Sequence, residues 1–522
     1  MMGETRTSRK HARAMAIGAF LVLAQIAPAT AEPLPRPETM VGSEAMLREI
    51  SDMMVGGQAD PRARLARLDA MLAELRQPNE MRGLVQYLRA IHLLRTQREP
   101  AAREAIEESI RLLPAYSAPL LFATHLEAFA DRPAAAADYF LRASDIDPQV
   151  ARGIPPYDLR NLIGRLDARN DLRRVARLSE RLIAIDWQGR DVQMRSRLAL
   201  EAIRARVAAG DLAGARAFVP RLIAPLHLQS LLIDNRYRDI WSDLETWGGS
   251  RQERLWPVYL TELKAQFAAS AEPEAAQHYG TALRSAGHHR TIVREIGPLF
   301  DRRLDRREDY DLLWVAPMVA DALARLGRWA EIEPMFERAA RTWPLGLDAN
   351  ALNIAGNRAR FRLLAGDAGA SADAMNAVIA DAGRHCGQVS ADALATMHLH
   401  RACALHEAGR EHETIDSAAA VLGAGDPSLA VSLHLCFGQH DAARAALVNA
   451  LAREATRDDV LWYVQRWDVL PVQSDYGRKI EARVQVLKRD PILLRAVARY
   501  GRVLPYSPNA GAPPEALALQ PR

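Results

Sequence analysis

Apolar residues recur along most of the chain at the three- and four-residue spacing of an amphipathic α-helix. The clearest example contains Val175, Leu178, Leu182 and Ile185, which share one face, whereas the neighbouring arginines fall largely outside it. The alternating patterns bounded by Asn-Gly or Asp-Gly turns that would predict strands are absent from the sequence. The spacing therefore predicts an all-α chain from residue 43 to about residue 503.

Candidate turn residues separate these predicted helices at regular intervals. Most of the successive intervals are close to the length of one helical-hairpin repeat, about 40 residues. Hairpins that bury their apolar faces against their neighbours keep such a rhythm, whereas independent domains do not. We therefore predict a helical solenoid of about ten to eleven hairpins, including an earlier turn at Gly56-Gly57. The repeated turns fall at Gln97, Asp131, Asn170, Gly210, Gly248, Gly287, Gly327, Gly366, Gly409 and Gly438.

The best of these hairpins, from Leu313 to Pro344, has small residues where its helices would meet and a turn at Gly327. Two earlier units have the same pattern, and each closes at a proline, Pro114 in one and Pro148 in the other. The interval between these prolines and the placement of small residues resemble the tetratricopeptide repeat (TPR). The resemblance covers most of the chain as architecture and three units as sequence. The positions that carry it are Ala90, Leu93, Ala102, Ile106, Thr124, Ala136, Phe140, Ala143, Ala320, Leu323, Phe336 and Ala339.

The resemblance implies a right-handed superhelical scaffold that binds a protein or peptide in its concave groove and has no enzymatic site. In the family, the first helix of each hairpin lines that groove. Six of the eight residues that this register places there are arginines, whose planar side chains bind carboxylates through paired hydrogen bonds. An acidic partner segment would fit, although an arginine-rich helix also exposes arginines to solvent without any partner. The eight residues are Arg160, Arg197, Arg204, Asn235, Arg238, Arg284, Asn353 and Arg360.

The first 31 residues have the composition of a bacterial secretory signal peptide. Basic residues precede an apolar run from Met15 to Ala27, and small residues precede Glu32, where we predict cleavage. We expect residues 32–42 to form a proline-rich linker, residues 43–503 the solenoid, and residues 504–522 a proline-rich disordered tail. No later segment is long and apolar enough to span a membrane. The sequence therefore predicts a periplasmic or secreted protein.

The charge balance argues against two classes of partner. The net charge is +4, but the predicted leader holds four basic residues and one acidic residue, so its cleavage would lower that charge to +1. Binding to nucleic acid requires a strong basic surplus, and so does adsorption to an acidic membrane surface. We therefore expect neither nucleic acid nor a membrane as the partner.

An aromatic cluster interrupts a chain that is otherwise poor in aromatic residues. It consists of Tyr237, Trp241, Trp247, Trp256 and Tyr259, which lie close together in the sequence. Four of them, Tyr237, Trp241, Trp256 and Tyr259, are candidates for an exposed patch that would stack on a sugar or a peptide. The alternative is packing at an irregular hairpin, where large rings fill the space that poor repeat geometry leaves.

Half of the 14 histidines and all three cysteines lie between residues 385 and 440. His400, Cys403 and His406 would share one side of a helix, and Cys436 on a neighbouring helix would complete a soft-metal site. The segment lacks HxxxH, CxxC and CxxCH spacings, so we predict ordinary core and groove residues and no metal. The sequence leaves open whether Cys403 and Cys436 form a disulfide.

The chain has no pattern that indicates catalysis. GxSxG, HExxH, glycine-rich phosphate-binding and EF-hand spacings are all absent from the sequence. We predict no catalytic residues and no cofactor. The leading hypothesis is a periplasmic adaptor that holds a protein segment during envelope assembly or export. The alternative is a factor that binds an envelope polysaccharide or peptidoglycan.

Overall fold

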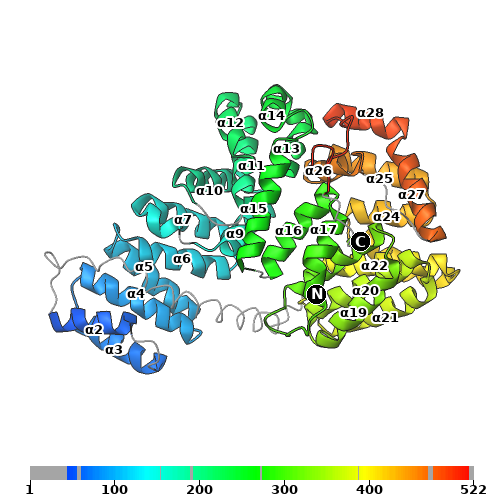
Figure 1. Cartoon of the computed structure of the whole chain (residues 1–522). Coiled ribbons are helices and arrows are strands. Elements are labelled where there is room, and N and C mark those ends of the chain that lie inside the picture. The colour runs from blue at the N-terminus through cyan, green and yellow to red at the C-terminus, as the bar shows by residue number, and fades with distance from the viewer. Residues whose placement is uncertain are drawn as a thin grey trace, which may run out of the picture. The chain divides into compact units, whose positions relative to one another are not determined.

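The computed structural model describes residues 44–55, 60–152, 154–187, 192–270, 273–385, 387–467 and 474–515. The regular structure of these residues is helical, apart from a single antiparallel bridge between Asp234 and Gly501. The prediction of an all-α chain of helical hairpins is thereby confirmed. The chain divides into unit 1, residues 1–208, and unit 2, residues 209–522 (Figure 1). The predicted signal peptide and proline-rich linker lie outside the described residues.

Unit 1 is a series of helical hairpins that pack on one another in chain order. Its helices approach closely where their facing residues are small. Ala90, Ala102 and Ala136 lie at such contacts, and each is 0% exposed. Phe140 fills the adjoining space and is also fully buried. These are residues of the TPR-like pattern. The helices are α2 (Glu44–Val55), α3 (Pro61–Glu74), α4 (Glu80–Arg95), α5 (Glu99–Leu112), α6 (Ser117–Phe129), α7 (Pro133–Ile146), α8 (Pro148–Arg152), α9 (Pro156–Asp167), α10 (Leu172–Ala184) and α11 (Val192–Ala208).

Unit 2 begins with an irregular stretch and continues as regular hairpins. Between residues 219 and 254, short α-helices and 3-10 helices replace the long helices of a repeat. No helix of the described residues is both long and apolar enough to cross a membrane. The elements are α12 (Leu212–Phe218), η1 (Val219–Arg221), α13 (Pro225–Leu232), η2 (Asn235–Ile240), α14 (Trp241–Gly248), α15 (Leu255–Ser270), α16 (Pro273–Ala286), α17 (His289–Thr291), η3 (Ile292–Ile296), η4 (Gly297–Phe300), α18 (Leu312–Arg325), η5 (Trp329–Glu331), α19 (Ile332–Thr342), η6 (Ala349–Ala351), α20 (Leu352–Ala365), α21 (Ala368–Arg384), α22 (Ala391–Glu407), η7 (Glu411–Thr414), α23 (Ile415–Gly423), α24 (Pro427–Cys436), α25 (His440–Ala452), α26 (Glu454–Tyr463), α27 (Asp475–Lys488) and α28 (Pro491–Tyr500).

One residue with a left-handed backbone marks each of the ten repeated turns, whereas the earlier turn at Gly56-Gly57 lies outside the described residues. Nine of the ten predicted turn residues have a positive φ, from 55° at Asn170 to 99° at Gly366, and at the tenth the left-handed residue is the neighbouring Gly249. At Gly366, backbone amides of the turn donate to carbonyls that the end of α20 would otherwise leave free. Asp367 then caps α21 by accepting a hydrogen bond from the amide of Ala370. The same short segment therefore ends one helix and begins the next.

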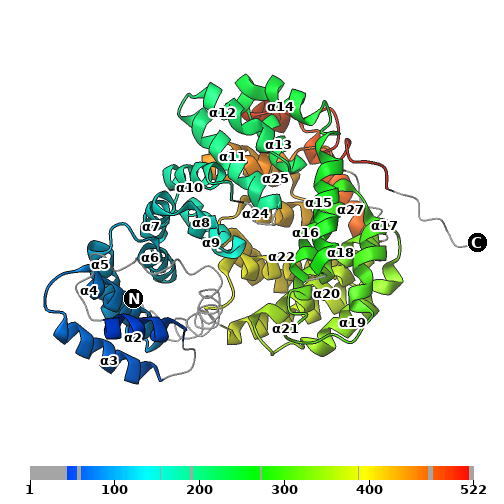
Figure 2. The ribbon, with the colours of Figure 1, turned by 60° about the vertical axis from the view of Figure 1, so that its left-hand side comes forward.

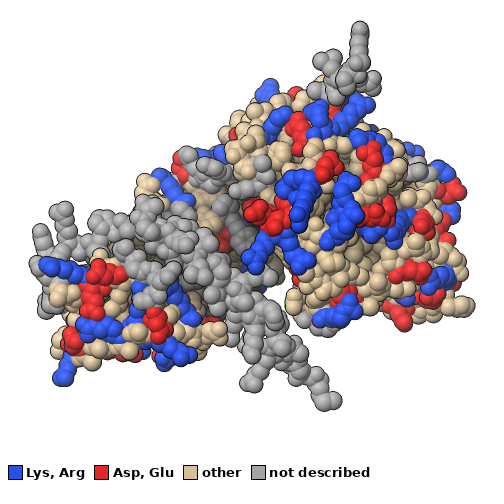
Figure 3. Space-filling view, turned by 60° about the horizontal axis from the view of Figure 1, so that its bottom comes forward, with Lys and Arg blue, Asp and Glu red and all other residues tan. Residues whose placement is uncertain are grey.

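Many arginines of both units form ion pairs with carboxylates on a neighbouring helix. Cationic and anionic side chains accordingly lie beside one another on the visible face of the described residues (Figure 3). Exposed pairs of this kind each contribute about 0–1 kcal/mol to the free energy of unfolding. Each pair therefore stabilises the fold only slightly, although it connects two neighbouring helices. Examples are Arg174–Asp138 at 2.9 Å, Arg206–Glu180 at 2.7 Å, Arg358–Glu333 at 2.5 Å and Arg410–Asp373 at 2.8 Å.

Helix α27, which precedes the last helix, folds back onto earlier helices of unit 2, where it packs against α20, α24 and α25. The Lys479 ammonium lies 2.8 Å from the Glu407 carboxylate at the end of α22. Arg483 donates to the backbone carbonyls of Leu435 and Cys436, each at 2.7 Å, at the end of α24. Helix α27 therefore covers the C-terminal ends of α22 and α24.

A C-terminal strap, residues 501–515, joins the last helices of unit 2 to its first helices. The Arg502 amide donates to the carbonyl of Ile233 (2.9 Å), next to the bridge that pairs Asp234 with Gly501. Farther along the strap, His288 Nε2 lies 2.6 Å from the carbonyl oxygen of Pro513. Residues 501–515 therefore connect the last part of unit 2 to its first part.

The prediction of a disordered tail from residue 504 is wrong for residues 504–515. Prolines do exclude a helix there, but the segment is held by specific contacts instead. Leu504 is 2% exposed, and its amide donates to the Gln465 side chain at 3.0 Å. Proline removes hydrogen-bond donors without preventing extended chain from packing on helices. Residues 516–522 lie outside the described residues.

Acid is expected to destabilise unit 1 through His92, which lies in α4 and is 2% exposed. Burial, with a smaller effect from the Arg95 charge, lowers the pKa of His92 to about 4. The unfolded chain binds a proton at His92 below about pH 6.5, whereas the folded chain does not until about pH 4. Stability is therefore lost as the pH falls between these values, by about 3 kcal/mol in all.

Urea unfolding of His92→Leu and native chains at pH 7 and pH 4.5 measures this effect. His92→Leu should remove most of the difference between the two pH values, whereas the exposed His412→Leu should keep it. An unchanged pH dependence in His92→Leu would contradict the assignment.

Candidate partner-binding surface

Five helices of unit 2, α16, α18, α20, α22 and α24, lie side by side in chain order. The helices α19, α21, α23 and α25 follow α18, α20, α22 and α24, and each packs against the helix before it. Figure 2 shows α18, α20 and α22 toward the inner side of the curve that unit 2 makes, and α19 and α21 toward its outer side. We call α16, α18, α20, α22 and α24 the inner helices. They occupy the place that the TPR resemblance assigns to a binding groove.

Four titratable side chains of the inner helices form what we call the inner cluster: Arg284 on α16, Asp321 on α18, Arg360 on α20 and His400 on α22. Burial lowers the pKa of Arg360, Asp321 opposes this effect, and Arg284 adds to it. Burial and the Arg360 charge lower the pKa of His400 to about 3, so His400 is neutral at pH 7. Arg284 is exposed, and the other three side chains are half-buried.

Arg284 and Arg360 differ from the many paired arginines of this chain. Among the described residues, neither guanidinium has a carboxylate within 4.0 Å or a side-chain hydrogen bond; Arg360 lies over the Phe361 ring, 5.0 Å from its centroid. The Asp321 carboxylate is 3.4 Å from Arg325 Nε, which partly neutralises it. The inner cluster therefore offers one exposed cation, Arg284, and one half-buried cation, Arg360. This arrangement can bind a carboxylate through charge-assisted hydrogen bonds.

Asn353, a third predicted groove residue of the inner helices, forms hydrogen bonds within the chain. Its side-chain amide donates to the carbonyl of Leu313 on α18 at 2.5 Å. Its side-chain oxygen accepts a hydrogen bond from Asn357 Nδ2 at 2.8 Å. Asn353 therefore joins α20 to α18 and positions the helix that carries Arg360.

Three predicted groove residues belong to unit 1 instead, on α9 and α11. Arg197 pairs with Asp167 at 2.6 Å, and Arg204 lies 3.5 Å from Glu201, a carboxylate only 6% exposed. Burial raises the pKa of Glu201, although Arg204 and Arg197 oppose that shift. Arg160 is half-buried on α9. The eight predicted residues are therefore divided between two units, and two of these arginines already pair within the chain.

Asn235 and Arg238 lie on the 3-10 helix η2, so the predicted placement of these two residues on a first, groove-lining helix is wrong. Helix α13 ends at Leu232, and the 3-10 helix η2 follows, which breaks the repeat register used to place them. The Asn235 side chain donates to the carbonyl of Ala498 on α28 at 3.3 Å. The Arg238 side chain is 72% exposed and lies 3.6 Å from Asp239.

The aromatic cluster packs at the irregular stretch, as the packing alternative predicts, and does not form the exposed patch of the other alternative. Tyr237, Trp256 and Tyr259 are 5%, 0% and 4% exposed. Trp241 donates its indole N–H to a backbone carbonyl at 2.9 Å, and the Arg502 guanidinium of the strap covers its ring at 3.7 Å. These rings fill space around the irregular stretch, where short helices cannot pack as a regular hairpin.

Cys403 on α22 and Cys436 on α24 form a disulfide, with their Cα atoms 5.7 Å apart. The pairing settles a question that the sequence leaves open. It also consumes the two thiolates that the alternative of a soft-metal site requires. No cluster of three or more metal-binding side chains occurs among the described residues. Cys386 lies outside them.

Two members of this surface do not follow from the predicted register. The sequence predicts His400 only as an ordinary core or groove residue, and the structure places it near the Arg360 charge. Tyr476 comes from α27, and burial and the Glu407 charge raise its pKa to about 12. It also interacts electrostatically with Arg360. The histidine-rich composition of residues 385–440 was a signal for His400, whereas no local pattern indicates that α27 returns to α20.

No protein-family model and no curated protein matches the chain. Among solved structures, the chain is similar to one described as the crystal structure of the P58(IPK) TPR domain at 2.5 Å, with 14% identity, 85% of this chain and 97% of that chain covered, and a TM-score of 0.20. That superposition is too poor to carry an argument. The chain's own hairpins and turns define its class, which is a helical-repeat protein.

Proposed function

We propose that this chain is a secreted scaffold that binds a partner protein on the inner helices of unit 2. The observation that carries the proposal is the pair Arg284 and Arg360, two cations on one surface, neither of which has a carboxylate within 4.0 Å among the described residues. A glutamate, an aspartate or a C-terminal carboxylate of the partner would supply the missing anion. The proposed activity is binding, and it requires neither a cofactor nor turnover.

Two observations support an oxidising compartment outside the cytoplasm. The Cys403–Cys436 disulfide is a feature that cytosolic reductants normally prevent. The first 31 residues have the charge and apolar pattern of a signal peptide. The proposal therefore includes a periplasmic location and a partner that takes part in envelope assembly or export.

A peptide array tests the binding surface. Twelve-residue peptides of random sequence, half of them with two added glutamates, are probed with the native chain and with Arg284→Gln/Arg360→Gln. The native chain should select acidic peptides, and the variant should bind them about tenfold more weakly, since each lost contact is a charge-assisted hydrogen bond.

The matched control is Arg221→Gln/Arg495→Gln, which removes two exposed arginines of unit 2 outside the inner helices. This control should select the same peptides as the native chain. Equal selection by all three chains would contradict the proposed surface. Binding of an anionic polysaccharide, but of no peptide, would instead favour a polysaccharide-associated factor.

A further inference from the structure

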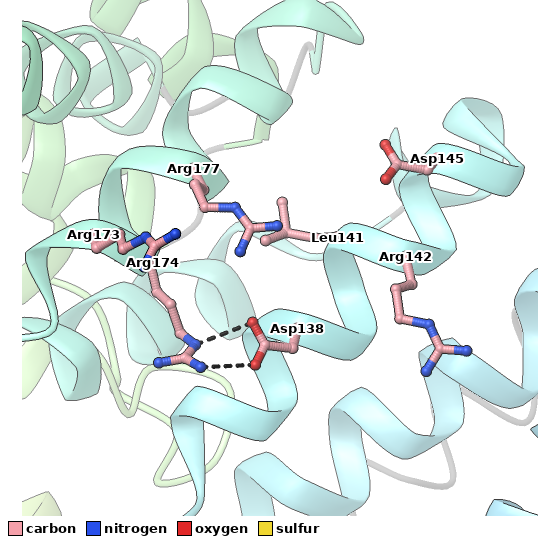
Figure 4. A pocket seen from close by; sticks show the side chains of 7 residues that line it. All are labelled: Asp138, Leu141, Arg142, Asp145, Arg173, Arg174 and Arg177. Carbon is pink, nitrogen blue, oxygen red and sulfur yellow. Dashed lines mark hydrogen bonds and ion pairs between the residues drawn. The ribbon is translucent and has the colours of Figure 1, made fainter.

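A cleft of about 420 Å³ lies in unit 1, between α7 and α10. These are the second helices of two successive hairpins, so the cleft is not on the first helices to which the TPR resemblance assigns the groove. Figure 4 shows arginines on both sides of it and Leu141 between them. The residues that line it are Asp138, Leu141, Arg142, Asp145, Arg173, Arg174 and Arg177.

The two carboxylates of the cleft are already engaged by arginines of α10. Asp138 accepts hydrogen bonds from Arg174 Nε at 3.0 Å and from Arg174 Nη2 at 2.9 Å. Asp145 lies 3.2 Å from Arg181. Arg174 is therefore held in a fixed position, and its bond to Asp138 ties the two walls of the cleft together.

Arg173 and Arg177 remain available on the α10 wall. Both are exposed, and among the described residues neither makes an ion pair or a side-chain hydrogen bond. Arg142 on the α7 wall lies over the Tyr139 ring, 5.9 Å from its centroid. The cleft thus holds four arginines against two aspartates, which leaves it with a net positive charge. Leu141 is 6% exposed and gives the cleft an apolar wall, which strengthens nearby ion pairs.

The spacing of the available arginines matches a particular ligand. Arg173 and Arg177 are four residues apart on a helix, so their backbones are separated by about 6 Å along its axis. Residues i and i+2 of an extended peptide lie about 6.7 Å apart and face the same side. Two carboxylates at that spacing would each meet one guanidinium. A single phosphate group carries its charge on one centre, so it would not present a separate anion to each guanidinium at this spacing.

We propose that this cleft is a second binding site, which takes an extended acidic peptide with carboxylates on alternate residues. The site is independent of the inner cluster, because its residues lie on other helices in the other unit. Two binding sites in one chain would let the scaffold hold two acidic segments, of one partner or of two, at the same time.

Fluorescence anisotropy with a labelled peptide of alternating glycine and glutamate tests this site. Every chain carries Arg284→Gln/Arg360→Gln, so that the inner cluster cannot supply the binding. In this background, Arg173→Gln/Arg177→Gln should weaken binding at least about tenfold. The matched control, Arg62→Gln/Arg76→Gln, removes two exposed arginines at and near α3 and should change binding less than about twofold.

Each other outcome overturns the proposal. Equal weakening by both double variants would show only nonspecific attraction to a basic surface. Binding of the matching glycine-glutamine peptide would show that carboxylates are not recognised. Binding of inorganic polyphosphate through Arg173 and Arg177, without binding of the glutamate peptide, would assign the cleft to phosphate. Because the inner cluster is disabled throughout, failure here leaves the proposed function of that cluster to its own test.

Discussion

Replacing both Arg502 and Leu504 by alanine is expected to lower the free energy of unfolding of unit 2 by about 4 kcal/mol or more. Arg502 donates to the carbonyl of Leu232 at 2.7 Å and to Glu245 at 2.9 Å, besides covering the Trp241 ring. Removing a buried leucine side chain alone costs about 2–5 kcal/mol. Loss of the strap would also expose the side of the Trp241 ring that Arg502 covers. Urea unfolding followed by tryptophan fluorescence measures the change.

The neighbouring pair Leu494→Ala/Arg495→Ala is the matched control. It removes the same two residue types from α28, where Leu494 is 37% exposed and Arg495 is also exposed. Its cost should be less than about 1 kcal/mol. If the two double variants unfolded at the same urea concentration, the strap would not be part of the folded unit.

Reducing the Cys403–Cys436 disulfide is expected to cost about 3–4 kcal/mol. The bond closes a loop between residues 33 apart in sequence, and in the chain-entropy account such a loop destabilises the unfolded state by about this amount. The two half-cystines are 4% and 3% exposed, and they join α22 to α24, two inner helices. The inner surface should therefore loosen when the bond is reduced. Thermal melts with and without dithiothreitol measure the loss.

A Cys386→Ala background leaves only the two paired cysteines and prevents exchange with a third thiol. In that background, Cys403→Ala/Cys436→Ala should melt at about the temperature of the reduced chain and should not respond to dithiothreitol. If the Cys386→Ala variant purified from the periplasm had two free thiols, Cys403 and Cys436 would be reduced. That result would contradict both the disulfide and the proposed compartment.

The sequence predicts the hairpins because local chemistry determines them. A left-handed residue such as Gly366 can end a helix wherever it occurs, and a following aspartate such as Asp367 can cap the next one. Small residues such as Ala136 likewise indicate close helix contacts without reference to distant parts of the chain. These features repeat at intervals, so their positions can be read along the sequence alone.

The errors arise where distant segments decide the structure. Asn235 and Arg238 leave the predicted register because short helices replace a hairpin there, and the contact that holds Asn235 comes from α28. The strap looks like a disordered tail, since its prolines exclude helix and its partners, such as Leu232 and His288, lie far earlier in the chain. Aromatic side chains such as Trp256 are buried by that same irregular packing. No local pattern encodes these contacts.

The arginines show both what the sequence predicts and what it cannot predict. The sequence predicts arginines that bind carboxylates of a partner. Some of these arginines instead pair with carboxylates of the chain itself, as Arg197 does with Asp167. The register alone cannot separate such arginines from Arg284 and Arg360. The distinction depends on whether a carboxylate on an adjacent helix comes within reach, which only the three-dimensional arrangement determines.

Photo-cross-linking in the envelope tests whether a partner binds on the inner helices of unit 2. A photoreactive benzoylphenylalanine replaces either Asn357, on α20 beside Asn353, or Ala380, an exposed residue of α21. We expect one protein to be cross-linked from position 357 and not from position 380, and we expect Arg284→Gln/Arg360→Gln to abolish the product. Cross-linking from position 380 alone, or an undiminished product in the double variant, would contradict binding of a partner on the inner helices.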